Sequence, residues 1–500
     1  MEYISYFNKS MNEEHETYDK YFIYFFYFLI IYIFYTYRFY YFSLKNVPIL
    51  NPTIPFGDLK KIFKPKKPRF EYFQEYYNKF KLRGHKHGGI FMFFKPYYVP
   101  VDLNYVEAIL GKDFDKFSSR GFNVKSNKIN DNLFNLNGEK WKILRVKTTK
   151  ILLRDNIKKY LPNVEKVLTN FTKYLDKNDQ KTIEIQEINK NFSLDLIANL
   201  YFGIDLNNFI EKNRVFEKNV LALHKKSLYN SKFYIFSFLF PYLFKLDTFP
   251  KKTVKYFKKS LDETIDFRET NQIKKNDILQ VILEENKDLK IDEIVSQCLL
   301  LITFTNETIS NTLNFLIFEL SRNLHVQDKL REEIQEKVAQ NELNCDLINQ
   351  MDYLNQVLNE TLRLYPIIPT IIRNSMKDYQ LPGDKNEETL SAGTGVLISI
   401  LGIHKDPEIY ENPDQFIPER FAEENCINRH HYAFLPFGEG PRLCPAIQFS
   451  KMILKVTLIT LIRRFRFVLD TSKTKNLAFN KGSVVMRPKN SLYVRVEKLC

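Results

Sequence analysis

Cysteine is scarce in this chain of 500 residues: there are five, and no two have the C-x-x-C spacing. An odd number of scattered cysteines argues against a disulfide framework and against a zinc site, and it indicates a reducing compartment around the protein. The five are Cys298, Cys345, Cys426, Cys444 and Cys500.

Domain linkers and nucleotide-binding motifs are also missing. After residue 60 no segment rich in proline, glycine or serine divides the chain and no repeat occurs, so we expect one large domain over residues 59–500. The absence of a complete G-x-G-x-x-G fingerprint argues that this chain does not itself bind a nicotinamide dinucleotide. The net charge is +15, from 74 Lys and Arg against 59 Asp and Glu. Without a nucleic-acid motif, this charge favours membrane lipid or an acidic protein as partner.

An uncharged apolar run near the N-terminus predicts a membrane anchor over residues 21–44. Its first part, residues 21–37, carries no charge, and the run continues past Arg38 to approach the ~20 residues that a bilayer-spanning helix needs. A signal peptide is the alternative, but the run begins late and no small-residue cleavage site follows it. Acidic residues precede the run and basic residues follow it, so the positive-inside rule places residues 1–20 in the lumen and the main domain in the cytosol.

The pattern of apolar residues downstream predicts a mainly α fold with small β-sheets. Prolines at 48, 52 and 55 first predict a stiff, non-helical hinge over residues 45–58. The clearest predicted helices cover residues 184–201, 251–269, 292–323, 326–339, 354–364 and 446–464. The predicted strands are few and cover residues 89–94, 396–400 and 492–496.

The segment FGEGPRLC at residues 437–444 combines a glycine-bent loop with a cysteine just before an apolar stretch. Glycine at positions 438 and 440 lets the backbone bend sharply and approach a flat cofactor. Pro445 suits the first position of the following helix, which would place the Cys444 sulfur near the positive end of the helix dipole. A cysteine thiolate can hold a haem iron, and Arg442 can pair with a carboxylate. The alternative is a small buried cysteine after a turn.

This segment resembles the haem-binding loop of the cytochrome P-450 family, F-G-x-G-x-R-x-C-x-G, and departs from it only where Ala446 replaces the last glycine. The resemblance covers nearly the whole chain. GIFMFFKP at 89–96, KFSSRG at 116–121 and LFNLNGEKW at 133–141 are similar to insect microsomal members of the drug-metabolising clan. It implies the cytochrome P-450 fold after a single transmembrane helix, and haem b as cofactor. Cys444 would be the axial thiolate, with Phe437 in the cofactor-binding loop.

The resemblance also assigns a set of residues to the haem propionates. Trp141 and Arg145 are one helical turn apart, so an indole and a guanidinium could converge on one propionate. Arg120, Arg373 and Arg442 join this set through the resemblance alone. The alternative for Trp141 and Arg145 is an ordinary core tryptophan beside a surface arginine.

FTNET at residues 304–308 resembles the oxygen-activating stretch of the family, in which two small residues precede an acid and a threonine. A threonine in mid-helix can bond the carbonyl four residues back and loosen the helix, which opens a groove for dioxygen and water. The resemblance implies that Glu307 and Thr308 relay protons there as catalytic residues. Phe304 and Thr305 replace the small residues, and they predict either a narrowed groove or a local rotation of the helix that preserves activity.

Glu360 and Arg363 lie three residues apart on one face of a predicted helix. The resemblance joins them to Arg420 in a buried cluster that would lock the region leading into the cysteine loop, whereas the alternative is a solvated surface pair. Lys147 and Lys150 predict either a docking site for an acidic flavoprotein or a solvated face. The aromatic run at 233–244 predicts either a membrane-dipping rim of the substrate entrance or a buried segment.

The resemblance implies a monooxygenase that inserts one oxygen atom from O₂ into a lipophilic substrate, such as a xenobiotic, a hormone or a fatty compound. Electrons would come from NADPH through a separate flavoprotein reductase, with cytochrome b5 as a further partner. The implied location is the endoplasmic reticulum membrane, with the catalytic domain on the cytosolic side. Two alternatives are a haem-thiolate isomerase and a haem- or ligand-binding protein without catalysis. The positions that would contact substrate are the loop at 120–128, Phe304, Thr370, Ile371 and residues 484–485.

Overall fold

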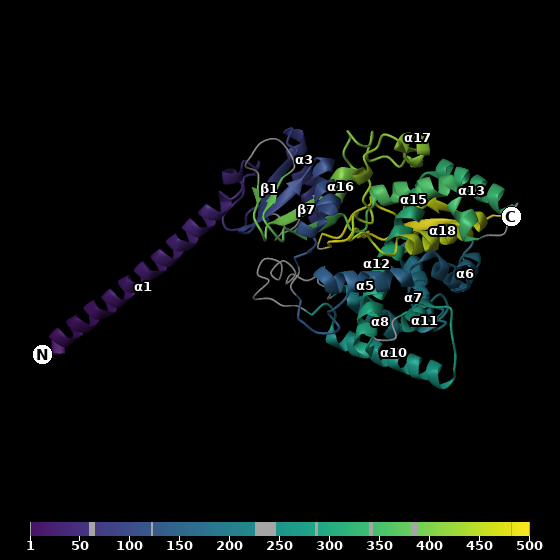
Figure 1. The fold of residues 1–500 in the computed structure, drawn as a ribbon, viewed down its shortest axis with the longest axis horizontal. Coiled ribbons are helices and arrows are strands. Elements are labelled where there is room, and N and C mark those ends of the chain that lie inside the picture. The colour runs from purple at the N-terminus through teal and green to yellow at the C-terminus, as the bar shows by residue number, and fades with distance from the viewer. Residues whose placement is uncertain are drawn as a thin grey trace.

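The computed structural model describes residues 2–59, 66–121, 124–225, 247–285, 289–339, 344–381, 389–481 and 483–499. Within these ranges a long N-terminal helix projects from a body that has a large helical part and a smaller part rich in strands (Figure 1). The aromatic run at 233–244 and Cys500 lie outside the described residues.

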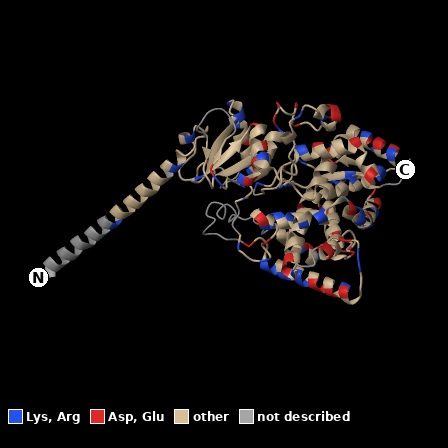
Figure 2. Cartoon of the chain, in the orientation of Figure 1, with Lys and Arg blue, Asp and Glu red and all other residues tan. Residues whose placement is uncertain are grey.

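Helix α1 (Glu2–Phe39) forms the projection (Figure 1). The segment Lys20–Lys45 is long and apolar enough to cross a membrane, with a mean hydropathy of 1.5 in its most apolar window. The large apolar side chains of residues 21–34 are exposed, and no charged residue interrupts them (Figure 2). Phe42, in contrast, is fully buried in the body, where its ring centroid lies 5.3 Å from that of Phe91. The apolar run is therefore divided in the structure: its first part is an exposed helix, and its end is packed in the core of the body.

Residues 46–58, all of them described, follow the short helix η1 (Ser43–Lys45) and contain no helix, as their prolines predict. They lie along strand β1 (His87–Met92). Isolated bridges join Ile49 to Gly89 and Gly57 to Met92. The Asp58 N–H also donates to the Phe91 carbonyl at 2.7 Å. The connector is thus bonded to the sheet rather than free in solvent.

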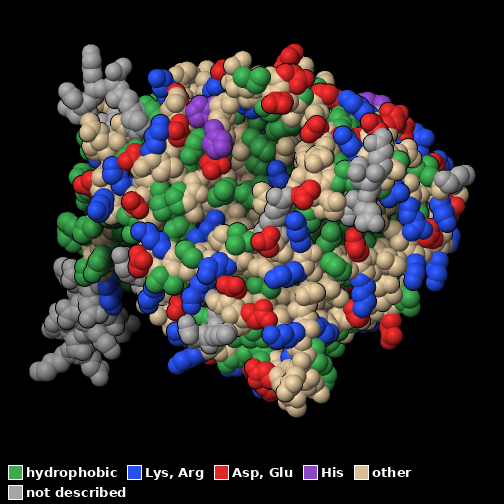
Figure 3. All heavy atoms as spheres, turned by 45° about the vertical axis from the view of Figure 1, so that its right-hand side comes forward, with side chains coloured by type: hydrophobic (Ala, Val, Ile, Leu, Met, Phe, Trp, Pro, Cys, Tyr) green, Lys and Arg blue, Asp and Glu red, His purple; other side chains and the backbone are tan. Residues whose placement is uncertain are grey.

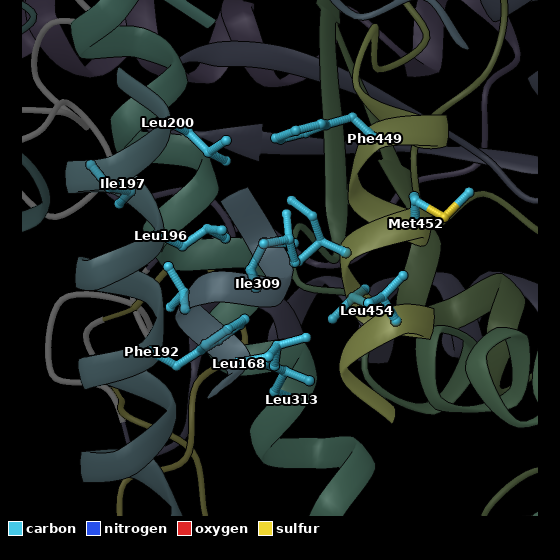
Figure 4. Close-up of a cluster of buried hydrophobic side chains, with 14 of the residues drawn as sticks. Leu168, Phe192, Leu196, Ile197, Leu200, Ile309, Leu313, Phe449, Met452 and Leu454 are labelled. Atoms are coloured by element: carbon cyan, nitrogen blue, oxygen red, sulfur yellow. The ribbon is translucent and has the colours of Figure 1, made fainter. Parts of the chain in front are cut away.

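The centre of the body is helix α12 (Ile291–Arg322), which packs on α7 (Ile185–Phe202), α10 (Lys251–Thr270), α15 (Asp352–Leu364) and α18 (Ile447–Arg464). Helices α7 and α12 bury most of their residues, as expected of helices that are covered on all sides. Figure 4 shows the resulting core, in which Phe192 and Leu196 of α7 face Ile309 and Leu313 of α12, with Leu454 of α18 beside them.

The other helices surround this centre or cover the sheets. They are α3 (Arg69–Leu82), α4 (Leu103–Glu107), the π-helical turn η2 (Ala108–Lys112), η3 (Phe114–Lys116), α5 (Gly138–Ile151), α6 (Arg154–Asp176), α8 (Arg214–Lys225), α11 (Ile278–Glu285), α13 (Leu324–Ala339), α14 (Cys345–Asn349), α16 (Ile400–His404), η4 (Pro418–Phe421), α17 (Glu423–Cys426) and η5 (His431–Ala433).

Three small sheets complete the described fold. The first has the order β1-β2-β7-β4, with β2 (Lys95–Pro100) parallel to β7 (Gly395–Ser399) and the other pairs antiparallel, including that with β4 (Thr370–Asn374). The second has the antiparallel order β3-β9-β8 (Thr182–Glu184, Tyr493–Lys498, Phe465–Leu469). The third pairs β5 (Tyr379–Gln380) with β6 (Thr389–Leu390).

The predicted fold class and all six predicted helices are confirmed, with ends that shift by at most two residues. The predicted strand at 89–94 is wrong at its end, because Phe93 has a φ of 55° in the turn that joins β1 to β2. Strands β2, β4 and β8 are not predicted by the pattern. Strand β2 is buried on both faces and so lacks an alternation of apolar and polar residues, whereas β4 and β8 are only five residues long. Helix α6 is also missed, because Pro162 lies in its interior.

Candidate functional site

The cysteine loop lies between η5 and α18 and turns back on itself. The Cys444 N–H donates to the Phe437 carbonyl at 3.0 Å, and the Ala446 N–H donates to the Cys444 Sγ at 3.4 Å. Helix α18 begins at Ile447 with Ala446 as its N-cap, so the prediction that Pro445 occupies the first helical position is wrong. The half-buried Cys444 sulfur nevertheless lies beside the first turn of α18, where the helix dipole favours negative charge.

Gly438 and Gly440 both adopt left-handed backbone conformations, with φ of 74° and 75°. A Cβ at position 440 would lie only 1.8 Å from the Leu110 carbonyl oxygen of η2. A Cβ at position 438 would meet nothing closer than the Ile371 side chain at 3.7 Å. Gly440 is therefore fitted closely against the protein's own backbone, and the approach of this loop to a flat cofactor stays a prediction.

Arg442 points from the cysteine loop to the start of α5. Its Nη2 donates to the Leu136 carbonyl at 2.7 Å and to Asn137 Oδ1 at 2.9 Å. Its guanidinium stacks over the Trp141 ring, 4.4 Å from the centroid. The structure therefore brings Trp141 and Arg442 into direct contact, and Asn137 is a partner that the sequence did not indicate.

Three more of the predicted arginines lie near Arg442. Burial and the nearby charges of Arg120, Arg373 and Arg145 lower the pKa of Arg442 to about 8. Burial and Arg120 lower the pKa of Arg373 to about 9. The Arg373 Nη1 donates to the Ile372 carbonyl, and Arg442 donates to a carbonyl and to an amide oxygen. These acceptors carry no charge, so they do not neutralise the positive charges of the two arginines. The result is a buried, positively charged cluster that would favour an anion with more than one carboxylate.

Helix α12 carries the predicted acid and alcohol. The Thr308 Oγ1 donates to the Phe304 carbonyl at 2.9 Å, which is the bond to the preceding turn that the sequence predicts. Thr305 is directed away from this position, since its hydroxyl bonds the Tyr201 hydroxyl of α7 at 3.0 Å. The half-buried Phe304 ring packs against Phe134, with centroids 5.8 Å apart. Of the two residues that replace the family's small residues, Thr305 therefore joins helix α12 to helix α7.

Glu307 is bound by a residue that sequence reasoning did not single out. Its Oε1 lies 2.9 Å from Arg487 Nη2, on the segment that precedes β9. Asn311 Nδ2 donates to the Glu307 carbonyl at 2.7 Å and to the same Oε1 at 3.2 Å. No local sequence signal could have found Arg487, because the pairing joins two distant segments.

Glu360 and Arg363 form a bidentate ion pair with no exposed surface, at 2.7 and 2.8 Å. Arg420 Nε lies 3.4 Å from the same carboxylate. The structure thus brings the three predicted residues together. His404 ties this cluster to the cysteine loop, because its Nδ1 lies 3.0 Å from the Arg363 carbonyl and its Nε2 accepts the Leu435 N–H at 2.9 Å. Burial, followed by the Arg363 charge, lowers the pKa of His404 to about 3 and keeps the ring neutral.

Comparison with known proteins identifies the family of this chain. A family model described as Cytochrome P450 matches residues 48–495. The chain belongs to the cytochrome P450 family. It is 33% identical over 481 residues to cytochrome P450 6a8 of Drosophila melanogaster, covering 91% of this chain and 94% of the relative. It is 32% identical over 487 residues to cytochrome P450 6A1 of Musca domestica, covering 92% and 94% respectively.

Cytochromes P450 are haem-thiolate monooxygenases, and this cytochrome P450 is an oxidoreductase of that class. The residues present fit haem b, which carries two carboxylates. The buried Nε and Nη1 of Arg442 and the buried Nε of Arg373 have no hydrogen-bond partner among the described residues. Carboxylates placed beside these N–H groups would satisfy them and offset the mutual repulsion of the arginines.

The remaining predicted positions are more dispersed. Lys150 is exposed and lies 3.7 Å from Glu285 of α11, whereas Lys147 is half-buried on α5. Lysines and carboxylates alternate over the face of the cytochrome P450 seen in Figure 3, so on that face the positive charge is not gathered into one patch. Thr370 and Ile371 lie in β4, next to Arg373.

Proposed function

We propose that this cytochrome P450 is a membrane-anchored monooxygenase in which Cys444 is the axial ligand of haem b. The observation that carries the proposal is the position of the Cys444 sulfur, which accepts the Ala446 N–H beside the first turn of α18. Burial raises the pKa of the Cys444 thiol, whereas the hydrogen bond from the Ala446 N–H and the charges of Arg145 and Arg120 oppose that rise. An iron bound at the sulfur would supply the remaining stabilisation of the thiolate. When bound, the haem supplies the binding and reduction of dioxygen.

The chain's own residues hold this cofactor in place. Arg442 and Arg373 have buried N–H groups to offer to the propionates. Trp141 stacks on the Arg442 guanidinium and so orients it, while Arg120 and Arg145 add positive charge to the same cluster. Phe437, whose carbonyl accepts the Cys444 N–H, keeps the ligand loop closed.

Glu307 and Thr308 are the proposed route for protons to the reaction centre. The Thr308 hydroxyl donates its hydrogen to the Phe304 carbonyl, so its oxygen can accept a hydrogen bond from a water molecule and hold that water in place. The Glu307 side chain is 12% exposed, which leaves it accessible to solvent as a source of protons. General acid catalysis of this kind contributes about 10²- to 10⁴-fold to a rate.

The anchor, residues 21–44, would hold residues 1–20 in the lumen and the catalytic domain, residues 59–500, on the cytosolic side of the endoplasmic reticulum. The exposed apolar face of α1 supports this proposal, because such a surface is unfavourable in water. The segment at 45–58, which is bonded to β1, would fix the angle between anchor and domain. NADPH-dependent reductase, with cytochrome b5 as a second partner, would supply electrons, and the substrate would be a lipophilic small molecule.

The absorption spectrum of the reduced, carbon monoxide-bound protein tests the proposal. We expect a red-shifted, thiolate-type Soret band that Cys444→Ala abolishes. Cys426→Ala is the matched control, because Cys426 is also half-buried but lies outside the loop. An unshifted Soret band in the parent, or a thiolate-type band that survives in Cys444→Ala, would contradict the assignment of the ligand.

A further inference from the structure

Arg487 lies in the segment just before β9 and reaches Glu307 in the middle of α12. The two are joined by the 2.9 Å contact between Arg487 Nη2 and Glu307 Oε1. The Glu307 side chain is 12% exposed and that of Arg487 30% exposed, so the pair is partly shielded from solvent. Partial burial strengthens an ion pair relative to one on an open surface.

The segment that carries Arg487 is itself held in place. The Met486 N–H donates to the Ile367 carbonyl at 2.9 Å, and the Met486 side chain is 2% exposed. The Val485 N–H donates to Ser483 Oγ at 3.2 Å. Because its neighbour is buried and bonded, Arg487 presents its guanidinium to α12 from a defined position.

Asn311 is a second partner of the Glu307 carboxylate, beside Arg487. Its Nδ2 donates to Oε1 at 3.2 Å, the same oxygen that forms the ion pair with Arg487. Thr308, the next residue of the proposed proton route, is bonded to a different group, the Phe304 carbonyl. The acid and the alcohol are thus oriented by separate partners.

We propose that Arg487 is a positioning residue for the oxygen-activating acid: it holds the Glu307 carboxylate in the orientation from which protons are delivered. This inference rests on the proposed function of Glu307 and adds the residue that directs it. Without the guanidinium, Oε1 loses its 2.9 Å ion-pair contact while the longer contact from Asn311 remains, and the carboxylate gains freedom to turn. Misplacement of a catalytic group by about 1 Å can cost about a hundredfold in rate.

The test compares Arg487→Gln, Arg487→Lys and Glu307→Gln in the full-length haem protein, with reductase, NADPH and a 7-alkoxycoumarin as probe. We expect Arg487→Gln to slow product formation by about tenfold to a hundredfold. The dissociation constant of the probe, read from the haem spectral shift, should stay unchanged, and the solvent deuterium isotope effect should rise. Arg487→Lys should retain most of the rate, because it keeps a cation near Oε1.

Arg466→Gln is the matched control, since Arg466 Nη2 also lies 2.9 Å from a carboxylate, that of Asp328, and is 35% exposed. The double variant Arg487→Gln/Glu307→Gln should be no slower than Glu307→Gln alone, because the two residues act as one unit. Equal rates in Arg487→Gln and Arg466→Gln would overturn the proposal, as would additive losses in the double variant.

A crystal structure of Arg487→Gln provides a readout that does not depend on turnover. We expect the Glu307 carboxylate to have rotated, and an unmoved carboxylate would refute the positioning role. A parent protein that lacks the thiolate-type Soret band would instead refute the proposed function, while the crystal structure would still decide whether Arg487 orients Glu307.

Discussion

Replacing Gly440 with alanine tests how closely the cysteine loop is fitted against η2. The new Cβ would lie 1.8 Å from the Leu110 carbonyl oxygen and 2.8 Å from its carbonyl carbon. Both are backbone atoms of the π-helical turn, so they cannot move aside as a flexible side chain would. Ordinary non-bonded contact begins at about 3.5 Å, so either the loop or the turn must shift by more than about 1 Å.

The expected cost has two parts. Alanine in the left-handed conformation that Gly440 adopts, with φ of 75°, costs about 1–2 kcal/mol. Overpacking against a fixed group adds about 1–3 kcal/mol. The total is about 2–5 kcal/mol, and the shift would also displace Cys444, whose neighbour Leu443 donates its N–H to the Gly440 carbonyl at 2.9 Å.

Gly438→Ala is the matched control. Its φ is 74°, but the nearest atom to a new Cβ is 3.7 Å away, so it should lose only the conformational part, about 1–2 kcal/mol. The assays are the urea unfolding midpoint and the fraction of protein with the thiolate-type carbon monoxide band. Gly440→Ala should lose more in both. Equal losses in the two variants would show that backbone conformation alone matters and would refute the argument from the Leu110 contact.

Three further predictions concern the packing that supports the site. Glu360→Gln leaves the buried Arg363 without its counter-charge, so unfolding in urea should become easier by about 3–5 kcal/mol and haem content should fall. An unfolded histidine takes up a proton below about pH 6.5, whereas His404 in the fold stays neutral until about pH 3, so stability should fall as pH drops through this range. In His404→Asn the urea unfolding midpoint should depend less on pH over this range. An unchanged pH dependence would contradict the view that His404 causes the loss of stability. Thr305→Val leaves the buried Tyr201 hydroxyl unpaired and should cost about 1–3 kcal/mol, which Tyr201→Phe in the same chain should largely recover.

Local features of the structure could be predicted from the sequence because their physical causes lie within a few residues of each other. Apolar periodicity predicted α7, α12 and α18, and the charge-free run predicted the exposed part of α1. The cysteine loop was evident from its glycines and Cys444, since turn conformation and metal ligation each need particular residue types. The bond from Thr308 to the preceding turn also follows from residue type and spacing alone.

Tertiary packing decided which distant residues meet. The sequence singled out Glu307 but not Arg487, and Arg442 but not Asn137, because such pairs depend on how segments far apart in the chain are placed. Phe42 reads as part of an apolar run, yet packing buries it in the body. By itself the sequence determined the elements and the chemistry of the ligand loop, whose causes are local. Only the three-dimensional packing determined the partners that orient that chemistry, because long-range contacts leave no periodic or spacing signal.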